Sequence, residues 1–340
     1  MKNGYIHLLF FLSVLLLVDS CAKPFDLTGR LEENGVIYIS SIMDGDDDFH
    51  RVRAGITHPI AGESQQTVSS LSIDLEINGK EVLLEEDPRQ PAEYDNEKLF
   101  LFNGTLAAGD QVRIRASADG CRSVEAQTTF IPPLPEMNVE KAEVSAHKKT
   151  EGNPELEHCL QFKIALDEKP SPDSYYAIQV RKFIELDTSH YVPEENDNID
   201  ILMANQEFIE PLCHLAPSSD LFQNWRSDIV GFYDGGMIQL FDASAQKGSQ
   251  VSMEVLVKYD ERKELTGLAG PGSCVYHPRY KLVVSRVSPE FYRYFEKSSI
   301  GRDDFFLIGG GYHTCPYTNV IGGLGILATR TIGESEWIYN

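Results

Sequence analysis

Hydrophobic and polar residues alternate along most of this chain, which is the pattern of half-buried β-strands. The clearest early case is residues 71–77, where Leu, Ile, Leu and Ile share one face and Ser, Asp and Glu the other. Asn78-Gly79 follows directly and favours a tight hairpin turn, so residues 81–84 are expected to return antiparallel. Similar short runs occupy 36–39, 52–56, 99–102, 111–116 and 124–130. About seven strands with no helical period between them predict an immunoglobulin-like sandwich over residues 35–131.

A second, larger region repeats the alternation after a proline-rich segment. Residues 132–136 contain three prolines and predict a stiff linker. A C-terminal β-rich domain is expected to follow over 137–340. Its alternating runs are 160–166, 176–180, 251–259 and 280–284. The predicted fold is therefore all-β, with two β-sandwich domains. The acidic stretch 185–234 breaks the pattern and is either an excursion over the sandwich or a binding feature.

One short helix is expected near the end of the second domain. Ser288 can cap it, Pro289 suits its first position, and Phe291, Tyr292 and Phe295 form an apolar stripe at helical spacing. We expect this stripe to pack against a sheet.

Downstream of the helix, Gly322-Gly323 and Gly325 precede a final predicted strand at 326–331. We interpret these glycines as allowing close backbone approach or a bulge. The alternative, an anion-binding loop, normally opens a helix, whereas β-branched residues follow here.

The chain begins with a pattern typical of lipoprotein signals. Lys2 precedes an apolar run at 6–18, which is shorter than a membrane-spanning helix needs, and Ser20-Cys21 follows. We therefore predict a signal peptide over residues 1–20, a lipid on Cys21 and a tether over 21–34. An uncleaved anchor, or an ordinary secretory peptide with Cys21 as an unmodified cysteine, is the alternative.

Charge and cysteine content narrow the classes of partner. The net charge is −22, so the chain repels nucleic acid, which we exclude as a partner. Five cysteines remain besides Cys21, an odd number that cannot all pair, and the sequence does not give their connectivity. They are Cys121, Cys159, Cys213, Cys274 and Cys315.

The aspartate run at 44–48 predicts a solvated hairpin loop between two early strands; Asp44, Asp46 and Asp48 are also the best metal candidates, because aspartates at alternate positions can converge on a calcium ion. The EF-hand pattern is not met, since Phe49 and Gly55 stand where its glycine and closing glutamate belong. Calcium binding is therefore the alternative to the loop, and no other cofactor is expected.

Trp225, Phe232 and Tyr233 could line a ligand surface beside the irregular stretch, or bury a sandwich edge. The chain contains neither Gly-x-Ser-x-Gly nor His-Glu-x-x-His, and we expect no catalytic activity.

Several of these segments carry a family resemblance. Ser288-Pro-Glu-Phe-Tyr-Arg-Tyr294, the segment Pro316-Tyr-Thr-Asn-Val-Ile-Gly-Gly-Leu-Gly-Ile326 and the earlier Thr128-Thr-Phe-Ile-Pro132 resemble a Bacteroidetes lipoprotein family, domain of unknown function 4249. Val320 and Leu327 depart from the family's usual isoleucine and aromatic residue. The resemblance implies an outer-membrane lipoprotein associated with TonB-dependent nutrient uptake, and it supplies no catalytic residues.

The leading hypothesis is therefore a lipid-anchored, non-catalytic binding or accessory protein that acts with a TonB-dependent outer-membrane receptor. The face of the membrane on which it lies is open. A structural or adhesive surface protein is the alternative, and a lipid-anchored hydrolase is the third.

Overall fold

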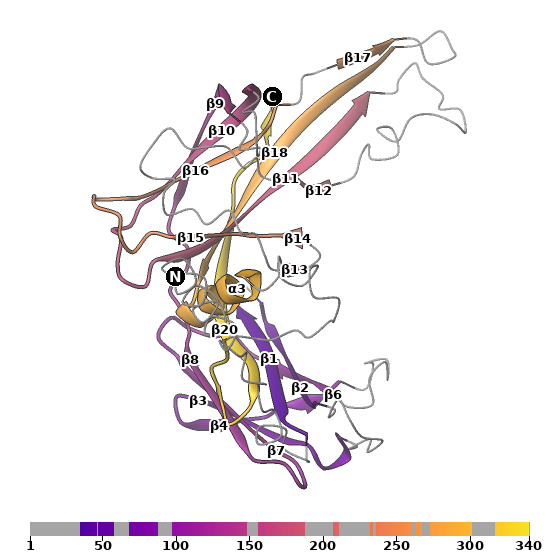
Figure 1. The fold of residues 1–340 in the computed structure, drawn as a ribbon, viewed down its shortest axis with the longest axis vertical. Coiled ribbons are helices and arrows are strands. Elements are labelled where there is room, and N and C mark those ends of the chain that lie inside the picture. Colours follow the sequence, from indigo (N-terminus) through magenta and orange to yellow (C-terminus); the bar gives the residue numbers. More distant parts are fainter. Residues whose placement is uncertain are drawn as a thin grey trace, which may run out of the picture.

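Two β-sandwiches share one long sheet in the computed structural model of the chain (Figure 1). The predicted all-β class is thereby confirmed. The described residues are 35–45, 47–57, 68–87, 97–147, 156–187, 207–210, 232–233, 236–259, 263–266, 273–300 and 317–339.

The shared sheet has eleven strands, in the order β12-β11-β18-β20-β1-β2-β6-β5, with β15 beside β11 and with β17 and β21 beside β18. The bounds of these strands are β1 Ile37–Asp44, β2 Phe49–Ile56, β5 Glu85–Glu86, β6 Glu97–Asn103, β11 Tyr175–Asp187, β12 Glu207–Glu210, β15 Gln239–Asp242, β17 Lys263–Thr266, β18 Ser273–Val287, β20 Leu324–Glu334 and β21 Ile338–Tyr339.

Two smaller sheets cover parts of the long one. A five-stranded sheet has the order β19-β8-β7-β3-β4, and a three-stranded sheet the order β16-β10-β9. Their strands are β3 Ser72–Ile77, β4 Lys80–Val82, β7 Gln111–Ser117, β8 Val124–Thr129, β9 Met137–His147, β10 Leu156–Leu166, β16 Val251–Lys258 and β19 Val320–Ile321. The remaining elements are the 3₁₀ turn η1 Val68–Ser70, the hairpin strands β13 Phe232–Tyr233 and β14 Gly236–Met237, and the helix α3 Pro289–Ile300.

The N-terminal sandwich forms because alternate residues of both its sheets are apolar. Ile39 of β1, Leu75 of β3 and Ile114 of β7 are among its fully buried side chains. The predicted hairpin between β3 and β4 is confirmed, with φ of 53° at Asn78 and 74° at Gly79. Both values belong to the left-handed region that this tight turn requires.

The C-terminal sandwich is built in the same way from β10 and β16 against β11 and β18. Phe162, Tyr176, Met253 and Tyr280 occupy its core. In Figure 1, β11 and β18 continue beyond this core as a projecting pair with β17 at its far end, which we call the β11–β18 arm.

Strand β20 joins the two sandwiches. Its residues 324–330 pair in parallel with β1, and residues 330–334 pair antiparallel with β18. Strand β19 also pairs with β8 of the N-terminal sandwich. Residues 320–330 follow the linker predicted at 132–136 in the sequence, yet they pair with strands that precede it. They therefore complete the N-terminal sandwich.

The proline-rich linker lies against this shared strand. Thr331 Oγ1 donates a hydrogen bond of 3.0 Å to the Pro132 carbonyl, and Arg286 Nη1 donates one of 3.4 Å to the Pro133 carbonyl. Leu134 packs on the C-terminal core. The linker thus fixes the junction between the sandwiches from one side.

The glycine-rich segment makes the corner between β19 and β20. A Cβ on Gly323 would lie 2.5 Å from the Ile37 carbonyl oxygen, and one on Gly325 would lie 1.9 Å from the Ile39 carbonyl oxygen. Close backbone approach, the structural interpretation of these glycines, is confirmed. Asn319 braces the same corner, since its side chain donates to the Leu327 carbonyl at 2.7 Å and accepts from the Leu327 amide at 2.9 Å.

The predicted helix is confirmed as α3. Ser288 Oγ lies 3.4 Å from the Phe291 amide and caps it. Phe291, Tyr292 and Phe295 pack on the face of the shared sheet opposite the C-terminal core.

Candidate functional site

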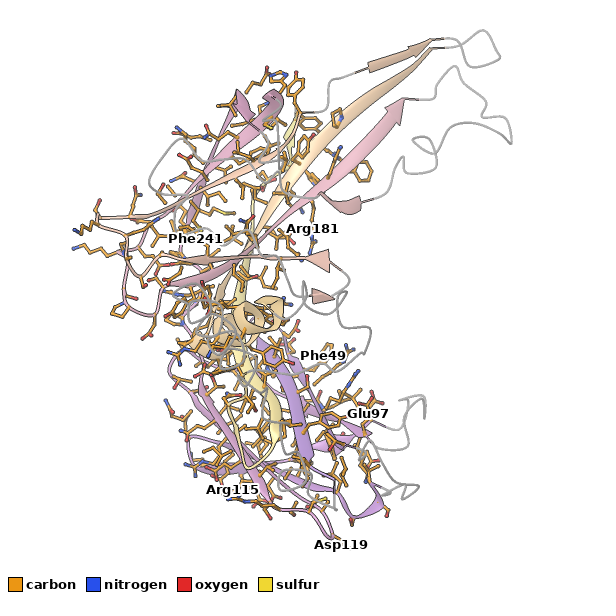
Figure 2. All side chains as sticks on the ribbon, viewed as in Figure 1. Phe49, Glu97, Arg115, Asp119, Arg181 and Phe241 are labelled. Carbon is orange, nitrogen blue, oxygen red and sulfur yellow. The ribbon has the colours of Figure 1, made fainter. Side chains whose placement is uncertain are left out.

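Seven charged or aromatic side chains lie together on the outer face of the shared sheet, where the β11–β18 arm leaves the sandwich. Strands β11, β18, β20 and β21 and the turn before β21 supply them. We call this set the cation–aromatic face; its members are Arg181, Phe183, Arg279, Lys281, Glu334, Trp337 and Tyr339. Figure 2 labels Arg181 near the middle of the molecule and Arg115 at the far end of the N-terminal sandwich.

Strand alternation and register bring these residues together. Arg181 lies opposite Lys281, and Phe183 opposite Arg279, on antiparallel neighbours. The residues between them point inward, so Lys182 and Tyr280 are buried. The face is therefore the solvent side of the same strands that build the C-terminal core.

Glu334 neutralises part of the positive charge. Its carboxylate accepts from Lys281 Nζ at 2.8 Å and lies 3.4 Å from Arg181 Nη1. Arg181 and Lys281 are like charges directly opposite each other, an unfavourable cross-strand pair whose repulsion the Glu334 carboxylate offsets.

Arg279 lies among three aromatic rings. Its guanidinium carbon is 4.4 Å from the centre of the Phe183 ring, 5.0 Å from that of Trp337 and 6.0 Å from that of Tyr339. Nη1 donates to the Tyr339 hydroxyl at 3.2 Å. Such contacts stabilise a cation through the negative faces of the rings.

The end of the chain holds these aromatic residues in place. Strand β21 pairs with β18 at Arg279 and Tyr280, and Lys141 Nζ of β9 donates to the Tyr339 carbonyl at 2.7 Å. Tyr339 itself is 57% exposed. The face is thus an open, ordered surface rather than an enclosed cavity.

A shallow pocket of about 510 Å³ lies at the opposite end of the molecule. Arg115 and Glu125 line it, but their side chains already bind each other at 3.0 Å, and Glu76 holds Arg115 from the other side. These cross-strand ion pairs form a network that is typical of the solvent-exposed face of a sheet.

The candidate calcium residues are placed in different ways. Both carboxylate oxygens of Asp44 accept from Arg330, and the Asp48 carbonyl accepts from the Gly104 amide at 2.8 Å. Asp46 lies outside the described residues. Within the described ranges, no three His, Cys, Asp or Glu side chains are grouped to hold a metal ion. Calcium binding stays a prediction, and an ion at Asp44 would compete with a guanidinium.

The side chains of the predicted ligand-binding residues are not among those that the structure describes. Trp225 and the predicted lipid site Cys21 lie outside the described residues. Phe232 and Tyr233 form β13, which pairs with β14, and their side chains are not described. In the described part of the chain, no helix is both long and apolar enough to cross a bilayer.

Sequence patterns alone did not identify the cation–aromatic face. The signals were present as Arg-x-Phe at 181–183 and Arg-x-Lys at 279–281, which place charged and aromatic residues on the outward side of two strands. Their convergence depends on a pairing between strands about a hundred residues apart, which these short motifs do not encode.

The fold defines the class of this protein: it is a β-protein of two sandwiches that share one strand, and the cation–aromatic face lies on the outer side of their common sheet. The chain belongs to the family described as "Domain of unknown function (DUF4249)", whose sequence model matches residues 23–335. The resemblance drawn from the helix and the glycine corner is thereby confirmed for the family.

Comparison with other proteins adds little to this assignment. No curated protein matches the chain. Among solved structures, the chain is similar to "Secreted serine protease VesC from Vibrio cholerae", with 9% identity and a TM-score of 0.19. The match covers 74% of this chain and 51% of the protease, so this chain spans about half of that protein's length. A TM-score this low carries no argument about fold or activity.

Proposed function

We propose that this protein is a lipid-anchored, non-catalytic accessory protein of a bacterial outer membrane, which acts by binding a TonB-dependent nutrient receptor. The observation that carries the proposal is the cation–aromatic face beside a projecting arm. Tyrosine, tryptophan and arginine are the residues most enriched where protein surfaces bind partners. The predicted lipid on Cys21 would hold the protein on the membrane that contains such a receptor.

The test is recovery of the protein from gently solubilised outer membranes, followed by mass spectrometry of the proteins that accompany it. An affinity tag belongs in the exposed turn at 247–250, because a C-terminal tag would cover Tyr339. We expect a TonB-dependent receptor in stoichiometric amount. Recovery alone, or with fimbrial subunits, would contradict the proposal and favour the adhesive alternative.

Cys21→Ser supplies the matched control for anchoring. The substituted protein should incorporate no labelled fatty acid and should leave the membrane fraction. If it stays membrane-bound and the wild type takes up no lipid label, the lipid anchor is wrong.

A further inference from the structure

Arg279 is a guanidinium with no carboxylate partner among the described residues of this strongly acidic chain. Among the residues that the structure describes, no Asp or Glu pairs with it, and its Nε is buried with no hydrogen-bond partner. Its neighbours Arg181 and Lys281 both contact the carboxylate of Glu334. Of the seven members of the face, three are positively charged and one is negatively charged, on a chain whose net charge is −22.

The guanidinium of Arg279 lies among aromatic rings without a described anion to balance its charge. Aromatic rings remove water from the guanidinium, and a desolvated cation regains most when it meets an anion in a two-pronged hydrogen bond. Arginine is well suited to this role because its planar fork matches a carboxylate. Nε is buried and one N–H of Nη1 is used by Tyr339, so the N–H groups of Nη2 and the second N–H of Nη1 are the donors left for such a pair.

We propose that the cation–aromatic face is the docking surface for an acidic segment of a protein partner, with Arg279 binding a carboxylate of that segment. The inference rests on the proposed function and names the surface through which the receptor would be bound. Charge complementarity selects an acidic partner. The openness of the face, with Tyr339 57% exposed, favours a protein segment over a small molecule, which is normally enclosed in a pocket.

The position of the face in the fold suits this role. The described part of the chain begins at Gly35, whose carbonyl accepts from Cys121 Sγ at 3.2 Å at the end of the N-terminal sandwich remote from the arm. Residues 21–34, if extended, would span roughly 50 Å. A tether of that reach lets the body turn so that the face meets a receptor in the same membrane.

The proposal is tested by photo-crosslinking in intact cells. A benzophenone amino acid replaces Tyr339, and a control chain carries it at Ile321, which is 71% exposed on the N-terminal sandwich. The crosslinked peptides are then mapped by mass spectrometry. We expect position 339 to crosslink to one outer-membrane protein, on a segment that contains Asp or Glu, and position 321 not to do so.

Charge substitutions assign the effect to Arg279. Arg279→Gln should lower the crosslink yield at least tenfold, whereas Arg115→Gln, which removes an arginine already held by two carboxylates, should leave it within twofold. Replacing the mapped carboxylate with lysine should abolish the crosslink, and Arg279→Glu should restore it. If Arg279→Gln does not accumulate as a folded protein, Arg279→Lys, which keeps the charge but loses the two-pronged geometry, is used in its place, and it should also lower the crosslink yield.

Several results would overturn the inference. These are equal crosslinking from position 321, a mapped segment without carboxylates, crosslinking to a glycan or lipid in place of protein, and an unchanged yield with Arg279→Gln. A receptor that still accompanies Arg279→Gln in full amount would leave the proposed function standing and remove this surface from it. Absence of any receptor beside the wild type would instead remove the proposed function.

Discussion

Arg330 and Asp44 face each other across the parallel pair of β20 and β1, and the guanidinium donates to both carboxylate oxygens. The Nη2 to Oδ2 distance is 2.9 Å. Arg330 is 8% exposed, and it is also the residue at which β20 passes from β1 to β18. A largely buried, two-pronged ion pair therefore holds the point where the two sandwiches meet.

Breaking this pair should strongly destabilise the protein. Asp44→Ala leaves a buried guanidinium without its carboxylate, and we expect a loss of about 3–5 kcal/mol in the free energy of unfolding. Urea denaturation followed by tryptophan fluorescence measures it. The double variant Asp44→Leu, Arg330→Met should recover much of the loss, because no buried charge remains.

The exposed pair of Lys98 with Glu86, at 3.0 Å, is the control for that experiment. Glu86→Ala should cost less than about 1 kcal/mol. Equal losses from Asp44→Ala and Glu86→Ala would show that the junction pair contributes no more than a surface ion pair.

Gly325 should tolerate no side chain. Its φ is 102°, and a Cβ there would overlap the Ile39 carbonyl, so Gly325→Ala should prevent β20 from pairing with β1. Gly109 is the matched control, with φ of 92° and open space around its Cβ position. Gly109→Ala should cost about 1–2 kcal/mol of strain alone. Similar melting temperatures for the two variants would contradict the close-approach argument.

Asn319 should be replaceable neither by alanine nor by aspartate. Its side-chain amide substitutes for a neighbouring strand at Leu327, which is fully buried. Asn319→Ala should cost about 1–3 kcal/mol for each backbone group left without a partner. Asn319→Asp loses the donor and places a negative oxygen against the Leu327 carbonyl.

The control for Asn319 is Asn138→Ala, since Asn138 is exposed on β9. It should change the unfolding free energy by less than about 0.5 kcal/mol. If the two alanine variants unfold at the same urea concentration, the bracing role of Asn319 is wrong.

Local elements of this fold were predictable because their physical causes are local. Residues 71–77 alternate in polarity and end at Asn78-Gly79, and Ser288-Pro289 precedes an aromatic stripe. Each signal lies within a few residues of the structure that it determines. The hairpin, the helix and the glycine corner were accordingly all anticipated.

The junction and the candidate site were not predictable in the same way. Asp44 and Arg330 are 286 residues apart, and their parallel pairing leaves no periodicity in either segment. The aspartate run at 44–48 predicts only a hairpin loop or a calcium site, because such a run gives no information about a distant arginine. The cation–aromatic face depends likewise on the register of β11 with β18.

His50 should make the protein less stable in mild acid. Burial lowers the pKa of His50 below its ordinary 6.5, against the opposing effect of its hydrogen bond to the Gly104 carbonyl. Its Nδ1 is buried with no partner among the described residues, so a proton there would be an unpaired buried charge. The unfolded chain therefore binds this proton more readily than the folded chain does.

The sign follows from that difference in proton binding. Stability contributed by neutral His50 is complete above about pH 6.5 and is lost as the pH falls toward the lower pKa of the folded state. Unfolding free energies at pH 7.5, 6.5 and 5.5 should thus fall more steeply for the wild type than for His50→Gln. The difference between the two slopes isolates His50, because the carboxylates titrate in both proteins. Parallel slopes, or a ring-proton titration of His50 centred at or above pH 6.5, would show that burial does not control this histidine.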